Sequence, residues 1–227
     1  NGYFLDCEKK QADKLVDRLN IYKLNSDIEI LNLSNEFEVA VISKNKFISL
    51  DGTKNLEGNT IRYNDDLVVL DPRSKELGGR IIANSEKLTL SIKNLGLKSE
   101  EPKKYYELSH KLGIPQINTL ELQDKIFGLE CNLEELNAID FKKGCYVGQE
   151  NTARMKLKNK IRKKLVPLKS DKKLKNGSDV NFKDLKVGKV IIAEPYPFAL
   201  IKLFDPDFAE FKDKDLLIDD EKSRIFQ

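Results

Sequence analysis

The nine residues 142–150, Lys-Lys-Gly-Cys-Tyr-Val-Gly-Gln-Glu, bring together a thiol, two lysines, two glycines, an amide and a carboxylate. Gly144 removes side-chain bulk beside Cys145 and lets the backbone turn sharply. The following residues, 151–157, can begin a short helix. A cysteine just before a helix N-terminus and close to lysines lies where a thiolate is stabilised. Cys145 is therefore a candidate reactive or metal-binding thiol. The alternative is a small buried residue in a tight turn.

The cysteine and histidine content limits the metal chemistry of the chain. Cys7, Cys131 and Cys145 are far apart and form no CxxC pair, which argues against a zinc site or a disulfide framework and for reduced thiols. His110 is the only histidine and is expected at the surface or boundary of a helix. An iron–sulfur cluster needs about four protein ligands. We therefore predict no metal site of the chain's own, and at most one ligand to a cluster shared with another protein.

Composition places the chain among globular proteins. Charged residues make up 34% and hydrophobic residues 40% of the 227 residues, and no run reaches the roughly 18 apolar residues that a membrane span needs. Together with the reduced thiols, this predicts a cytoplasmic protein with no membrane partner. The charge is uneven: residues 154–175 carry eleven Lys and Arg, and residues 205–221 carry eight Asp and Glu. Such a basic stretch is either a solvated face or a nucleic-acid surface, although few aromatic residues accompany it.

Periodicity indicates the elements that must position the motif. Residues 8–22 have the spacing of an amphipathic helix, with Ala12, Leu15, Val16, Leu19 and Tyr22 expected in the core. Strands are expected at 3–5, 27–33, 37–42, 67–70 and 80–83, and in the third of these Phe37, Val39 and Val41 are expected on the buried face. Asp71-Pro-Arg73 and Arg80 are read as a structural turn held by an ion pair. A helix is expected at 103–112 and a helical turn at 133–137.

The residue pattern of the sequence changes after about residue 161. Short strand-like runs at 164–168, 187–192 and 198–203 alternate with glycine and proline turns. This pattern indicates a small all-β unit, and we expect a barrel. The fold class predicted from the elements is α+β, with an α+β domain at 1–157 and a C-terminal β-barrel domain at 158–227.

The segment Lys143–Glu150 resembles the signature of the YgfZ-type folate-binding proteins, relatives of the glycine-cleavage T-protein, an aminomethyltransferase. The resemblance extends to several flanking segments: Arg18–Leu24, Asp71–Arg73 with Leu77, Gly78 and Arg80, Asn132–Leu136, Ala153–Lys156 and Arg162–Val166. In two respects the chain departs from the family. Asn151 and Thr152 stand where apolar residues are usual. The sequence also begins at Asn1 without methionine, so an N-terminal segment of the folate pocket is expected to be missing.

The resemblance implies an accessory factor that binds tetrahydrofolate and serves the assembly or repair of iron–sulfur proteins. Its clients would connect it to tRNA modification. Cys145 would be the functional thiol with a catalytic role, and the folate site would be formed by Lys143, Gly144, Tyr146, Gln149, Glu150 and Arg154. The amide and the carboxylate would bind the polar edge of the pterin, Tyr146 would pack against its ring, and Arg154 would attract the glutamate tail. Glu130 is a weaker candidate for the pterin.

Two other functions remain open from the sequence. One is a folate-dependent aminomethyl or one-carbon transferase, which would need a positioned acid or base and an acceptor site. The other is an RNA-binding module that uses the basic stretch 154–175. The expected partners are reduced folate and iron–sulfur assembly or client proteins, with nucleic acid as a weaker expectation.

Overall fold

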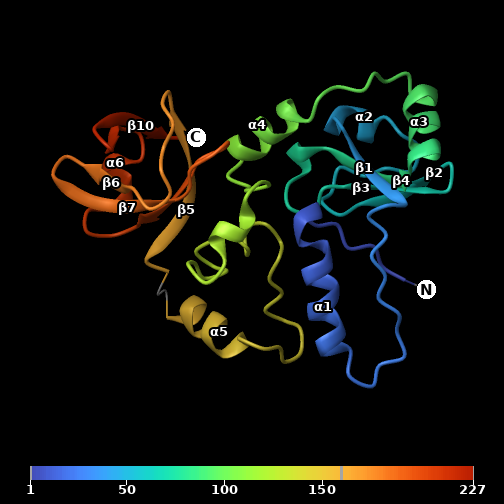
Figure 1. The fold of residues 1–227 in the computed structure, drawn as a ribbon, viewed down its shortest axis with the longest axis horizontal. Helices are drawn as coiled ribbons and strands as arrows, with labels where there is room; N and C mark the ends of the chain where they lie inside the picture. The colour runs from blue at the N-terminus through green and yellow to red at the C-terminus, as the bar shows by residue number, and fades with distance from the viewer. Residues whose placement is uncertain (1, 159–160, 227) are drawn as a thin grey trace. The chain divides into compact units, whose positions relative to one another are not determined.

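The computed structural model describes residues 2–158 and 161–226. Contacts divide the chain into two compact units, Asn1–Glu101 and Pro102–Gln227, and Figure 1 shows a sheet in the first and a barrel in the second. The predicted α+β class with a C-terminal barrel is confirmed. The division by contacts falls between Glu101 and Pro102, whereas the expected boundary lies at 157/158. As a division into functional domains, that boundary stays a prediction.

The first unit is built on an antiparallel sheet with the order β1-β4-β3-β2. Its strands are β1 (Phe37–Ile42), β2 (Thr60–Tyr63), β3 (Asp66–Leu70) and β4 (Gly79–Asn84). Helices α2 (Lys44–Ile48) and α3 (Ser85–Asn94) contribute Phe47 and Leu88 to the core on one face of the sheet. Along β3 and β4, buried residues alternate with half-buried ones. This two-residue period is typical of a strand with one face covered by helices.

Local chemistry fixes where these helices begin and where the chain turns. The Ser43 hydroxyl and the Asn84 amide oxygen accept backbone N–H groups at the first turns of α2 and α3. Gly78 has φ +87°, and a Cβ there would collide with the carbonyl oxygen of Ile42. Only glycine meets both conditions, so the predicted turn at this position is required by the packing of β1 against β4.

An ion-pair cluster closes the turn between β3 and β4. The carboxylate of Asp71 is fully buried and accepts the side chain of Arg73 at 2.7 and 3.0 Å. The guanidinium of Arg80 lies 3.5 Å from the same carboxylate and also pairs with Asp6. The structural interpretation of Asp71, Arg73 and Arg80 is therefore correct.

Several expectations for the first unit are wrong. Residues 3–5 and 27–33 are not strands, because no described strand pairs with them. Strand β1 is present, but Val39 and Val41 are exposed while Ile42 is buried. Alternation defines two faces without saying which is covered, and α2 and α3 cover the face opposite to the predicted one.

The N-terminal helix is also less buried than its pattern predicts. A short 3-10 turn, η1 (Lys9–Gln11), precedes α1 (Ala12–Lys23), so the predicted helix is present. Of the five residues expected in the core, Ala12 alone is buried, and Tyr22 is 52% exposed. An apolar stripe indicates a face that can be covered; here no described element of this unit covers it fully.

The second unit ends in a closed barrel with the strand order β10-β5-β8-β7-β6-β9 over the residues that the structure describes. The strands are β5 (Lys163–Ser170), β6 (Asp179–Phe182), β7 (Leu185–Ile192), β8 (Phe198–Lys202), β9 (Leu216–Ile218) and β10 (Glu221–Ile225), and a short helix, α6 (Phe208–Phe211), precedes β9. The predicted strands at 164–168, 187–192 and 198–203 are confirmed. The other three were missed because β9 has only three residues and because β6 and β10 carry several polar residues.

The expected helix at 103–112 is α4 (Lys103–Lys111), and it contacts the barrel through His110. His110 is buried, and its Nε2 lies 2.8 Å from the carbonyl oxygen of Pro197. Its ring meets those of Phe198 and Phe226 edge-on. The expected surface position of this histidine is therefore wrong. Burial lowers the pKa of His110, and the hydrogen bond to Pro197 opposes that shift.

Two further segments complete the unit. A 3-10 turn, η3 (Thr119–Leu122), leads into residues 131–137, where the N–H of Leu136 donates to the carbonyl oxygen of Asn132 at 2.9 Å in the expected turn. Helix α5 (Gln149–Leu157) begins within the motif, two residues before the expected helix at 151–157. None of the helices in the described chain is both long and apolar enough to cross a membrane.

Candidate functional site: the Cys145 loop and helix α5

Cys145 is exposed and lies four residues before the first residue of α5. Figure 1 shows the loop that leads into this helix. Gly148 caps the helix with φ +85°, a left-handed conformation that glycine adopts without strain. A Cβ added at Gly144 or Gly148 would meet no atom within 4 Å, so both sides of the loop are open. Cys145 is thus accessible, and the alternative of a buried packing cysteine is wrong.

The other two thiols have different surroundings. Cys131 is half-buried against Leu165, Ile192 and Phe198, and burial raises its pKa to about 11. Cys7 is an exposed residue, but partial burial of its thiol raises its pKa, and the neighbouring carboxylates raise it further. Both shifts favour the protonated thiol, which is neither the nucleophile nor the metal ligand.

The side chains on both sides of Cys145 contact one another. The ammonium of Lys143 lies 4.7 Å from the ring centroid of Tyr146, a cation–π contact. The N–H of Tyr146 donates to the side-chain oxygen of Gln149 at 3.3 Å, which ties the loop to the first turn of α5. The hydroxyl of Tyr146 is buried and has no hydrogen-bond partner among the described residues. A buried hydroxyl without a partner is costly, so it marks a place for a further polar group.

A shallow hollow of about 470 Å³ lies at the start of α5, and we call it the motif hollow. Its lining residues are Tyr146, Gly148, Gln149, Glu150, Asn151 and Arg154. The structure therefore brings together four of the six predicted folate-site residues, while Lys143 touches the hollow only through Tyr146, and Gly144 and Cys145 are not among the lining residues.

Charge at the motif hollow is already partly paired. Glu150 and Arg154 form an ion pair across one turn of α5, and both remain largely exposed. Asn151 also lines the hollow, although its sequence position suggested only a departure from the family pattern. A polar residue at the first turn of a helix beside a glycine cap was the available signal.

Glu130 has a structural role in the described chain. Its carboxylate accepts the N–H of Phe127 at 3.2 Å, and its backbone carbonyl accepts the N–H of Leu165 at 2.7 Å. Asn132 donates its side-chain amide to the carbonyl oxygen of Leu165 at 2.9 Å. These bonds hold the turn before the motif against β5, and they leave Glu130 buried and apart from the motif hollow.

The basic stretch 154–175 does not form one continuous cationic face. It runs from α5 into β5 and the following loop, and Lys160 lies outside the described residues. Of the ten described Lys and Arg in it, five pair with carboxylates: Arg154 with Glu150, Lys156 with Glu134, Lys164 with Glu135, Lys172 with Glu221 and Lys173 with Glu194. This pairing weakens the case for an RNA surface along the stretch.

The chain is similar to known proteins in sequence and in fold. No family model matches the chain. The chain is 28% identical over 166 residues to the mitochondrial iron-sulfur cluster assembly factor IBA57 homolog of Neurospora crassa, and 28% identical over 175 residues to IBA57 of Mus musculus. These alignments cover 73% and 74% of this chain but 37% and 45% of the relatives. The chain thus spans about two-fifths of their length.

The fold has a solved counterpart. The structure matches glycine cleavage system aminomethyltransferase T from Bartonella henselae with a TM-score of 0.65, over 96% of this chain and 65% of that one. The two sequences are 10% identical, so the match shows a common fold and nothing about activity. The aminomethyltransferase-like fold expected from the motif is confirmed.

The predicted cytoplasmic location is wrong, because the sequence relatives point to another compartment. The relatives from Neurospora crassa, Dictyostelium discoideum, mouse and human are all named as mitochondrial proteins. Composition and reduced thiols, on which the prediction rested, do not distinguish the cytosol from other reducing compartments.

Proposed function

We propose that this chain acts as an accessory factor in iron–sulfur cluster assembly, with Cys145 as its one ligand to a cluster that a partner protein also holds. The observation that carries the proposal is the exposed thiol of Cys145 on an open, glycine-flanked loop. The names of the similar IBA57 proteins support it. They also support a mitochondrial place of action.

The number of available ligands separates this role from that of a stand-alone cluster carrier. A cluster needs about four protein ligands. Among the described residues, no group of three or more His, Cys, Asp or Glu side chains could hold a metal ion. Cys131 is half-buried in a hydrophobic cluster and cannot reach a shared cluster without unpacking it. In the proposed step the thiol of Cys145 loses its proton to solvent, and its sulfur takes the place of one ligand on an iron atom of the partner's cluster. The displaced ligand leaves to solvent, and no atom changes its oxidation state.

The test of this ligand count is anaerobic reconstitution of the isolated chain with iron and sulfide. We expect no stable stoichiometric cluster by visible absorption and iron analysis. A stable cluster on the lone monomer that survives Cys145→Ala would overturn both the count and the role of the thiol. Cys7→Ala is the matched control, since Cys7 is the other exposed cysteine.

We further propose that the motif hollow binds a reduced folate. The unpartnered buried hydroxyl of Tyr146 fits a ligand that brings a polar group, and Gln149, Glu150 and Arg154 add an amide, a carboxylate and a guanidinium. These residue types suit the polar edge of a pterin and an anionic glutamate tail. When bound, tetrahydrofolate would supply a reduced pterin able to carry a one-carbon unit. The link to tRNA modification would run through client enzymes and stays a prediction.

Calorimetry with tetrahydrofolate tests the folate proposal separately. Arg154→Gln should weaken binding about five- to twentyfold, because it removes the guanidinium at the anionic tail. Lys158→Gln, an exposed cation near the end of α5 and outside the hollow, is the matched control and should leave affinity within about twofold. Absence of heat at high micromolar folate would remove folate from the account while leaving the role of Cys145 intact.

A further inference from the structure

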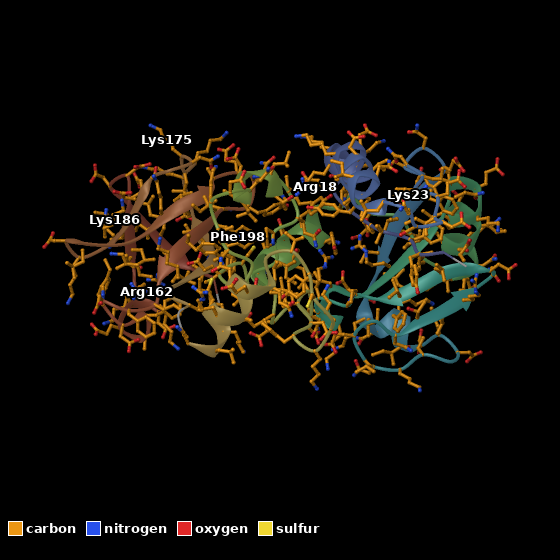
Figure 2. All side chains as sticks on the ribbon, turned by 90° about the horizontal axis from the view of Figure 1, so that it is seen from below. Arg18, Lys23, Arg162, Lys175, Lys186 and Phe198 are labelled. Atoms are coloured by element: carbon orange, nitrogen blue, oxygen red, sulfur yellow. The ribbon has the colours of Figure 1, made fainter. Side chains whose placement is uncertain are left out.

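A second hollow, of about 540 Å³, lies on the barrel, away from the Cys145 loop in sequence. Its lining includes five lysines from four segments of the second unit, and we call it the lysine hollow. They are Lys125 in the loop after η3, Lys163 in β5, Lys186 and Lys189 in β7, and Lys202 at the end of β8. Figure 2 shows the side chain of Lys186 projecting from the barrel strands into solvent.

The floor of the lysine hollow is aliphatic. Ile191 and Leu200 line it, and neither belongs to the core inside the barrel. Ala199 and Ile201, the neighbours of Leu200 along β8, are in that core. Because side chains alternate along a strand, Leu200 faces the outer surface of the barrel, where the lysine stems surround it.

The positive charge in this hollow is only partly balanced. Lys125 pairs with Glu121 at 2.9 Å and Lys186 with Asp179 at 2.6 Å. Within the described chain, Lys163, Lys189 and Lys202 have no carboxylate within ion-pair distance. Three of the five lysines that line the hollow therefore lack a carboxylate partner among the described residues.

Strand register makes the unbalanced charge costly. Lys163 and Lys202 are direct cross-strand partners in the antiparallel pair β5·β8. Like charges placed directly opposite one another destabilise a sheet. On the next strand Lys189 stands opposite Leu200, so all three unpaired ammonium groups surround the same apolar floor. A bound anion would relieve this repulsion.

We propose that the lysine hollow binds an acidic peptide segment of a partner protein, with one aliphatic side chain of that segment on the floor. The chemistry of the lining favours this occupant over RNA. None of the lining residues is aromatic and none is arginine, whereas single-stranded RNA is bound largely by stacking on aromatic rings and guanidinium planes. Lysines act as point charges suited to scattered carboxylates, and an aliphatic floor suits a leucine-like side chain.

The barrel also determines how such a peptide is held. Its strands close on themselves over the described residues, so β7 and β8 offer no free backbone edge for an added strand. Affinity must then come from lysine–carboxylate attraction and from burial of one apolar side chain. We expect binding that is moderate in strength and that falls steeply with salt.

The test is fluorescence anisotropy with a fluorescein-labelled peptide, Asp-Glu-Leu-Glu-Leu-Glu-Asp, added to the full chain at low ionic strength. We expect saturable binding with a Kd below about 1 mM. The same peptide with both leucines replaced by serine should bind at least about fivefold more weakly, because it loses its contact with the floor. Equal binding of the serine peptide would overturn the apolar part of the proposal.

The matched variants carry three Lys→Gln changes each. Lys163→Gln, Lys189→Gln and Lys202→Gln together should weaken peptide binding about tenfold or more, at roughly threefold per cation. Lys98→Gln, Lys169→Gln and Lys212→Gln remove the same charge from exposed positions outside the hollow and should change affinity by less than about twofold. An equal loss in both triples would mean attraction to net charge alone and would overturn the site.

Two further measurements complete the test. The hollow triple should unfold at the same or a higher temperature at low salt, since it removes the opposed pair Lys163 and Lys202; if it unfolds earlier, Lys189→Gln alone serves as the binding test. A labelled oligouridine of equal charge should bind more weakly than the peptide. Tighter RNA binding that depends on the same three lysines would replace the peptide with RNA and overturn the proposal.

Discussion

The three cysteines differ in access, and this difference carries most of the functional argument at the residue scale. Cys145 is exposed on an open loop, while Cys131 lies in the cluster around Leu165. The motif identified Cys145 from sequence because glycines, lysines and a helix start surround it. The unpartnered hydroxyl of Tyr146 had no sequence signal, since it depends on how the loop folds back onto α5.

The first prediction concerns alkylation of these thiols at pH 7.5. Cys145 should react first, Cys7 next and Cys131 last. The pKa of Cys131 is raised from 9.0 to about 11, which lowers its thiolate fraction about a hundredfold. Peptide mapping after timed labelling gives the order. In guanidinium chloride all three should react at similar rates. Labelling of Cys131 as early as Cys145 in the folded protein would contradict the order.

His110 makes the free energy of unfolding depend on pH. Because burial lowers its pKa in the folded state, the unfolded chain binds more protons as pH falls through and below about 6.5. The contribution of neutral His110 is therefore fully present above that pH and is lost on acidification. The groups around its ring are Tyr196, Phe198 and Phe226, with Lys111 over the last of these.

Urea unfolding at pH 5.5 and 7.5 measures this term. His110→Gln cannot be protonated, so its loss of stability between the two pH values should be smaller than that of the parent chain. At pH 7.5 the variant should be the less stable of the two, because it disturbs the ring packing and the bond to Pro197. Identical pH dependence in both proteins would exclude His110 as the source.

At the scale of elements, sequence patterns predicted six of the ten strands and three of the six α-helices in the described chain, but not which of their faces are covered. Strand β1 was expected and found, yet Val39 and Val41, which were expected on its buried face, are exposed. The choice of face depends on where α2 and α3 pack, which is a tertiary property. In the barrel, β6 and β10 escaped prediction because closure, and not their own apolar pattern, makes them strands.

The turn between β3 and β4 gives a prediction at this scale. Asp71→Ala should destabilise the first unit by about 3 kcal/mol, since it leaves Arg80 largely buried without this partner. Glu150→Ala breaks the exposed pair with Arg154 on α5 and should cost about 0.5 kcal/mol or less. Denaturant unfolding of both variants makes the comparison. Similar losses would mean that the buried carboxylate is not what holds the turn.

At the scale of the molecule, the two units differ in the candidate sites that they contain. The Cys145 loop, the motif hollow and the lysine hollow all belong to residues 102–227. The fold class was predictable because helix and strand periods are local properties of the sequence. Four of the six predicted folate-site residues line one hollow because they share a helix start, which is also local. The lysine hollow joins residues up to 77 positions apart, from Lys125 to Lys202, and only barrel closure brings them together.

The shared-cluster role of Cys145 is tested most directly by titrating the chain anaerobically into a carrier protein loaded with an iron–sulfur cluster. Visible circular dichroism reports the ligands of the cluster, and Cys145→Ser and Cys7→Ser are compared with the parent chain. The account predicts a new spectrum at a fixed stoichiometry with the parent and with Cys7→Ser, and an unchanged carrier spectrum with Cys145→Ser. The same new spectrum from Cys145→Ser would contradict the role assigned to this thiol.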